Sequence, residues 1–207
     1  MRDLQSMNCS KRRPRWSSIA MSVITTAAAF LISCASPEPT IVGGGRSVSL
    51  EPDEGLLVVQ ITTDVAVKEV FISGGSVAKD LPPGDHLWLV RLPAGRYSWS
   101  RIDLGPGFGW DGRIGPRNSS VGKDAEYEFD VQAGHLNYPG ELILRTNRIG
   151  RSSGLGIEIR NRNHSAMAVR RLRKRYSLVI EAFPLRYAGM SGDEFLEYFS
   201  KTRRTSK

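Results

Sequence analysis

Cysteine and histidine are scarce in this chain, and both scarcities narrow the classes of function. The 207 residues include 2 Cys and 3 His. Two cysteines exclude a disulfide-dense scaffold and any multi-cysteine zinc or iron–sulfur site built by this chain alone. The histidines form no His-x-x-x-His pair, and the chain has no Gly-x-Ser-x-Gly nucleophile motif. We therefore expect no enzyme, no cofactor and no bound metal, although a metal site assembled from His135, His164 and a distant acid stays open.

Long apolar runs are also scarce. Residues 17–33 carry no charge and many small or apolar side chains, but spanning a bilayer takes ~20 predominantly apolar residues, and Ser and Thr dilute this run. The preceding residues 1–15 hold five basic residues and one acidic residue. A basic segment followed by an apolar segment that ends in small residues is typical of an export signal. We expect residues 1–33 to be a signal peptide, with an uncleaved single anchor as the alternative.

The apolar segment ends in Leu31-Ile32-Ser33-Cys34, which resembles the lipobox of bacterial lipoproteins. The resemblance implies that the Cys34 thiol carries a lipid, because the thiolate is the nucleophile for thioether formation, and that the chain is cut before Cys34. Ala35, where inner-membrane lipoproteins of Gram-negative bacteria have Asp, implies the outer membrane, facing the periplasm. The partner would then be a membrane, reached through the N-terminal lipid. Ordinary secretion, with cleavage after Ala35, is the alternative.

Residues 34–53 hold three prolines and three consecutive glycines, a composition that predicts a flexible tether. Once residues 1–33 are removed and Cys34 is lipidated, the mature chain has no cysteine able to form a disulfide. Its fold must therefore depend on a hydrophobic core.

Residues 54–160 show the alternating and short apolar runs of β structure, separated by Gly- and Pro-containing turns. This spacing predicts an antiparallel β-sandwich of about seven strands. The expected strands are 56–62, 67–73, 86–92, 96–103, 125–131, 136–144 and 155–160, with a bulge or edge position at Pro139-Gly140.

Two segments of this region carry a second resemblance. Leu92-Pro93-Ala94-Gly95-Arg96-Tyr97 and the strand, turn and strand from Phe129 to Tyr138 are similar to the β-sandwich domains of envelope lipoproteins, the broad DUF2846-like and carboxypeptidase-regulatory-like group. Both motifs consist of strand and turn residues typical of β-hairpins and contain no active-site pattern. The resemblance therefore implies a fold and leaves the activity open.

Residues 161–207 are predicted to form a basic helical segment. Apolar residues recur at helical spacing from His164 to Phe183, where Pro184 ends the pattern. A second helix is expected to begin at Ser191, with Glu194 in the reciprocal capping position. The expected fold class is therefore α+β, an antiparallel β-sandwich followed by two C-terminal helices.

Charge is divided unevenly along the chain. Residues 51–144 have 8 basic and 14 acidic side chains, whereas residues 145–207 have 15 basic and 5 acidic ones. A basic segment of an exported protein attracts anionic lipids or glycans, and nucleic acid is in the wrong compartment. A solvated helix face partly paired with the acidic sandwich is the alternative. The candidate anion-binding residues are Arg170, Arg171, Arg173, Lys174 and Arg175.

Residues 104–123 form a long stretch with six glycines, where a loop inside a compact domain is usually functional or disordered. Phe108 and Trp110 are costly to expose, so they either fold back onto the sandwich or contact a partner. Taken together, these patterns favour a non-enzymatic lipoprotein that binds or scaffolds another envelope component. A secreted module that binds anionic lipid or glycan through its basic helix is the alternative.

Overall fold

A computed structural model describes residues 39–43, 47–104, 111–113, 124–149 and 154–205. The chain divides into two units, Met1–Cys34 and Ala35–Lys207. The first unit, with the predicted lipid attachment point Cys34, lies outside the described residues. The second unit contains all the elements described below.

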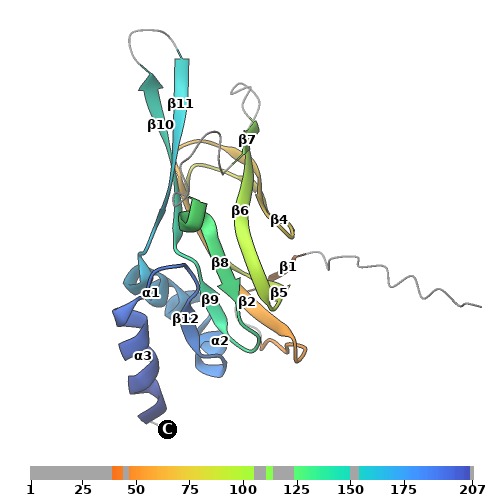
Figure 1. Ribbon diagram of the computed structural model, residues 1–207, viewed down its shortest axis with the longest axis vertical. Helices are drawn as coiled ribbons and strands as arrows, with labels where there is room; N and C mark the ends of the chain where they lie inside the picture. Colours follow the sequence, from red (N-terminus) through yellow and green to blue (C-terminus); the bar gives the residue numbers. More distant parts are fainter. Residues whose placement is uncertain (1–38, 44–46, 105–110, 114–123, 150–153, 206–207) are drawn as a thin grey trace, which may run out of the picture. The chain divides into compact units, whose positions relative to one another are not determined.

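The second unit is an α+β sandwich, which confirms the expected fold class, and its strands form two sheets (Figure 1). The smaller sheet has the order β4-β3-β6-β7, with β8 also paired to β6. The larger sheet has the order β1-β5-β2-β10-β11, with β9 beside β2 and β12 beside β9. Its strands are β1 (Thr40–Val42), β2 (Glu54–Thr63), β5 (Gly84–Pro93), β9 (Leu136–Tyr138), β10 (Glu141–Ile149), β11 (Gly154–Arg162) and β12 (Leu185–Tyr187). The smaller sheet consists of β3 (Val67–Ile72), β4 (Gly75–Leu81), β6 (Gly95–Leu104), β7 (Asp111–Arg113) and β8 (Glu128–Val131).

The larger sheet is mixed. β2 runs antiparallel to β5 but parallel to β9 and β10, and β12 runs parallel to β9. A parallel connection needs a long crossover, and between β2 and β9 the chain passes through the smaller sheet's strands and through β5 of the larger sheet. The β10–β11 hairpin projects beyond the other strands (Figure 1).

In the described ranges, three α-helices cover the outer face of the larger sheet: α1 (Ser165–Arg175), α2 (Ser177–Ala182) and α3 (Glu194–Thr205). A short 3₁₀ helix, Asp124–Tyr127, precedes β8. The helices pack through the apolar residues that the sequence predicted to share one face, and Leu172, Tyr176 and Ile180 are all buried. The layers are therefore helices, larger sheet and smaller sheet.

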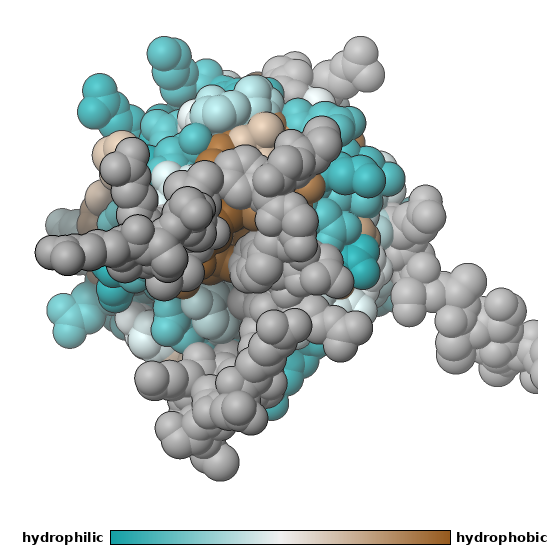
Figure 2. All heavy atoms as spheres, turned by 90° about the horizontal axis from the view of Figure 1, so that it is seen from above, coloured by the Kyte–Doolittle hydropathy of each residue, from teal (hydrophilic) through white to brown (hydrophobic). Residues whose placement is uncertain are grey.

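Strand β2 explains why the fold has two cores. Leu57 and Ile61 point into the core between the sheets, whereas Leu56 and Val58 point into the core under the helices. A strand buried on both faces reads as a continuous apolar run, as Leu56–Val59 does. Viewed from the end of the β10–β11 hairpin, some apolar residues are visible near the middle of that face, with hydrophilic residues around them (Figure 2). Both cores are built from described residues after Thr40, all of them within the unit Ala35–Lys207.

The N-terminal part of the fold differs from the expected tether over residues 34–53. Thr40–Val42 form β1, which pairs with β5, and Val48 and Leu50 pack against the helix-side core. These apolar side chains sit between Pro- and Gly-rich positions, where composition alone favoured a linker.

Two local expectations are also corrected. The helix predicted over 164–183 breaks at Tyr176, whose backbone leaves helical geometry (φ −133°, ψ 44°) while its ring stays buried. The last helix begins later than Ser191, because Asp193 caps it by accepting a hydrogen bond from the Leu196 N–H at 3.0 Å. The expected interruption at Pro139-Gly140 is present, and it separates β9 from β10.

Candidate functional site

The strongest candidate for a functional site is a cavity of about 440 Å³ between α1 and β5, called here the α1 pocket. It is lined by Arg171, Lys174 and Arg175 from α1 and by Asp85 and Leu87 from β5. Helix positions three and four residues apart share one face, so the three basic residues face the same cavity. With three basic residues and one acidic residue, the lining is formally positive.

Two of the three cations are held in place by β5. Arg171 Nη2 donates to Asp85 Oδ2 at 3.0 Å, and Arg175 Nη1 donates to the Leu87 carbonyl at 2.9 Å. Arg171 Nη1 is buried and has no hydrogen-bond partner among the described residues. Lys174 is exposed and makes no ion pair or side-chain hydrogen bond with any described residue. Of the three cations, Lys174 is therefore the one whose side chain is both exposed at the pocket and not used by the described fold.

Asp85 is the acid that positions Arg171. The Thr62 hydroxyl donates to Asp85 Oδ1 at 2.6 Å, and this hydrogen bond, together with the charge of Arg171, lowers the pKa of Asp85. Asp85 is therefore ionised at neutral pH and neutralises part of the guanidinium charge. Neither Asp85 nor Leu87 carries a sequence signal for a site, because the pairing with Arg171 joins positions 86 residues apart.

The structure brings together only three of the five predicted anion-binding residues. Arg173 turns toward α3, where its guanidinium lies 5.0 Å from the centre of the Phe199 ring. Arg170 is exposed, lies outside the pocket lining and has no ion pair with any described residue. The predicted basic face is thus partly used inside the fold and partly gathered at one pocket.

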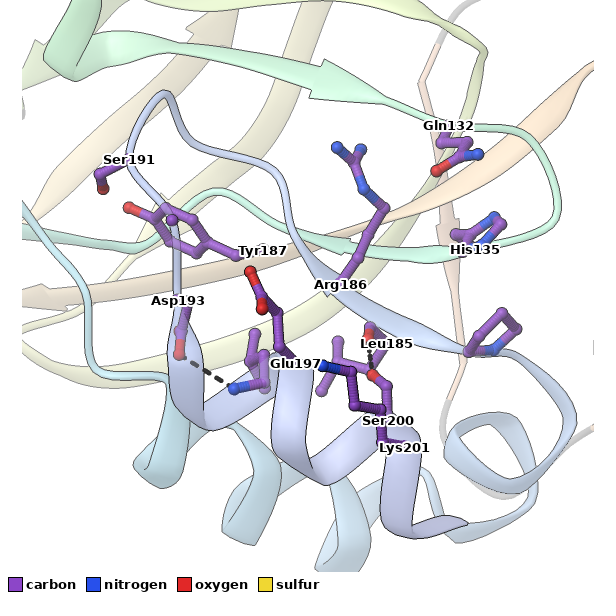
Figure 3. Close-up of a pocket in the computed structure, with 13 residues that line it drawn as sticks. Gln132, His135, Leu185, Arg186, Tyr187, Ser191, Asp193, Glu197, Ser200 and Lys201 are labelled. Atoms are coloured by element: carbon purple, nitrogen blue, oxygen red, sulfur yellow. Dashed lines mark hydrogen bonds between the residues drawn. The ribbon is translucent and has the colours of Figure 1, made fainter. Parts of the chain in front are cut away.

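A second cavity, of about 380 Å³, lies between β12 and α3 (Figure 3). His135 and Gln132 lie at one end, Tyr187 and Ser191 at the other, and Glu197 points into the space between them. The acidic Asp193 and Glu197 balance the basic Arg186 and Lys201 in its lining, and Arg186 is already paired with Asp130 at 3.5 Å. The groove therefore has no net charge to select one class of ligand. The sequence pointed to none of its charged residues.

A buried polar network surrounds Glu141, which is about 6% exposed. The Thr62 hydroxyl oxygen also lies 2.5 Å from Glu141 Oε1, so its single proton is shared between this carboxylate and Asp85, and the His164 ring bonds the other Glu141 oxygen. Burial acts to raise the pKa of Glu141, but these hydrogen bonds outweigh it and hold the pKa below its usual range. The Thr62 hydroxyl faces carboxylates and not the imidazole, so this network lacks the paired nucleophile and base of a catalytic triad.

The other two histidines bond to nearby backbone. His135 Nδ1 and the Ala133 carbonyl lie 2.7 Å apart, as do His86 Nε2 and the Pro82 carbonyl. His135 lines the cavity between β12 and α3, whereas His164 belongs to the Glu141 network. Their placement does not support a metal site shared by His135 and His164. No group of three or more His, Cys, Asp or Glu in the described ranges could hold a metal ion.

Cys34 and the contact loop residues Phe108 and Trp110 lie outside the described residues. In the part of the chain that the structure describes, no helix combines the length and apolar character needed to cross a membrane.

Comparison of the chain with family models, with curated proteins and with solved structures gives no match.

Proposed function

We propose that this protein is a non-enzymatic lipoprotein of the outer membrane, anchored through Cys34 and facing the periplasm, whose domain binds or scaffolds another envelope component. One observation carries the proposal: a basic segment, an uncharged apolar segment and Leu31-Ile32-Ser33-Cys34 follow one another in the order that lipoprotein export requires. Several lipid chains would hold the protein durably, whereas a single chain binds reversibly.

The position of the folded unit supports this proposal. The compact unit begins at Ala35, and its first strand begins at Thr40, so cleavage before Cys34 removes no strand or helix of the described fold. A binding role is supported by the α1 pocket and by the cavity between β12 and α3.

Metabolic labelling with palmitate tests the lipid anchor. We expect labelled protein in the membrane fraction, loss of label in Cys34→Ala, and a precursor that accumulates in the presence of globomycin. Cys9→Ala is the matched control, because Cys9 leaves with the signal peptide and its substitution leaves labelling unchanged. Equal labelling of the parent chain and Cys34→Ala would refute the proposal.

A second candidate function is a secreted module that binds anionic lipid or glycan through the basic face of α1. The α1 pocket favours it, because three cations converge there and two of them are already oriented. Binding of Ala35–Lys207 to anionic vesicles should weaken as salt rises, since exposed charges are screened over ~8 to 10 Å at 0.10 to 0.15 M salt. Salt-independent binding, or none, would remove this candidate.

A further inference from the structure

We infer that the α1 pocket binds the phosphate group of a membrane lipid headgroup. This inference takes the anion-binding site of the second candidate function, names the chemistry of its ligand, and combines it with the lipid anchor of the first proposal. The second candidate function invoked the whole basic face of α1, whereas this inference assigns binding to Arg171, Lys174 and Arg175. Arg170 and Arg173 lie outside the pocket and are not assigned a role in binding.

The pocket has the donors that a phosphate needs. Arg171 lines the cavity with its guanidinium fixed on Asp85, and Arg175 lines it with a guanidinium fixed on the Leu87 carbonyl. Guanidinium groups match phosphate oxygens with parallel N–H donors, and a lysine adds a mobile point charge. Lys174 supplies that charge from the exposed side of the same helix face.

The charge of the pocket suits an anion that carries more than one accepting oxygen. Asp85 faces the same cavity, but its two oxygens accept from Thr62 and Arg171, so its charge is compensated within the protein. Lys174 and Arg175 then remain as the net positive charge for the ligand. Because the two arginines are held before binding, less side-chain entropy is lost when an anion enters.

The location of the pocket favours a lipid source for the phosphate. Val42 of β1 pairs with Leu89 of β5, and Leu87, which lines the pocket, lies two residues or about 7 Å further along β5. Six residue steps separate Cys34 from Thr40, and they span at most roughly 20 Å. With the steps from Thr40 to Val42 and across to β5 added, a lipid at Cys34 would tether the pocket within roughly 40 Å of the bilayer surface. This step alone rests on the proposed lipid anchor.

A matched pair of variants tests the pocket. The protein is Ala35–Lys207, which contains both cores, and the probes are inorganic phosphate in solution and vesicles of phosphatidylglycerol or phosphatidylcholine. We expect Lys174→Gln to weaken phosphate and phosphatidylglycerol binding about ten-fold, as the loss of one charged hydrogen bond does. Arg170→Gln removes the same charge from the same helix outside the pocket and should change binding less than about two-fold.

Competition identifies the ligand. Inorganic phosphate should displace the protein from phosphatidylglycerol vesicles more strongly than chloride of equal ionic strength. Equal effects of the two variants, or no phosphate binding, would overturn the pocket. Phosphate binding that depends on Lys174, without vesicle binding, would overturn the lipid assignment. None of these outcomes alters palmitate labelling at Cys34, so they are distinguishable from failure of the lipoprotein proposal.

Discussion

Thr62 shows how one side chain organises the polar end of the larger sheet. Its hydroxyl lies 2.6 Å from Asp85 Oδ1 and 2.5 Å from Glu141 Oε1, although a hydroxyl has a single hydrogen to donate. Asp85 pairs with Arg171, which lines the α1 pocket, and Glu141 is hydrogen-bonded to His164 at the start of α1. Thr62 therefore links the proposed site to the position of the helix that carries it.

Glu141 gives a prediction about acid stability. Its pKa in the folded state lies below the ordinary value of 4.5, so the ionised group stabilises the fold above about pH 4.5. That contribution is lost as the pH falls through the folded pKa. We expect Glu141→Gln to lower the free energy of unfolding at pH 7 by about 1–3 kcal/mol, and to lose less stability than the parent chain on acidification.

Urea unfolding at pH 7 and pH 3.5 measures both effects. Glu181→Gln, an exposed carboxylate on α2, is the control and should follow the parent chain at both pH values. The same acid-dependent loss of stability in Glu141→Gln and in the parent chain would show that Glu141 is not its source.

Among the elements, those with strong periodicity were predictable and those made by distant pairing were not. Strand β2 and the apolar face of α1 and α2 are readable from a continuous apolar run and from a helical repeat. Strands β1 and β12 have three residues each, and β12 exists because Leu185–Tyr187 pairs with β9, nearly fifty positions earlier. Nothing local in those three residues specifies that partner.

The helix layer gives a prediction at the same scale. Leu172 on α1 is fully buried in the helix-side core, whereas Leu178 on α2 is 52% exposed. Leu172→Ala should lower the free energy of unfolding by about 2–5 kcal/mol, because it removes buried apolar surface and leaves a cavity. Leu178→Ala should change the free energy of unfolding by less than about 0.5 kcal/mol. Chemical denaturation compares them, and equal losses would contradict the assignment of the core.

For the whole molecule, the sequence pointed to the charge division but not to the site it creates. The net charge of +10 over residues 145–207 can be read from the sequence, and so can the cluster of five basic residues on one predicted helix. The sequence could not show that Arg173 contacts Phe199, or that Asp85 forms an ion pair with Arg171. Those contacts depend on how α1 lies across β5 and beside α3, which only the tertiary fold determines.

The molecule as a whole joins a short connection to a large folded unit. Only five residues separate Cys34 from the first strand, and that strand lies at an edge of the larger sheet beside β5. With a lipid at Cys34, the length of this connection would limit how far β1 and the neighbouring β5, which lines the α1 pocket, lie from the membrane. The anchor at Cys34 is therefore the central claim, on which the location of the protein and the source of its ligand both depend.

Intact-mass spectrometry of the protein extracted from bacterial membranes tests that claim most directly. A chain that begins at Cys34 and carries the mass of a diacylglyceryl group and an N-terminal acyl chain is the predicted result. An unmodified chain that begins at Ser36, as ordinary signal cleavage after Ala35 would produce, would contradict it.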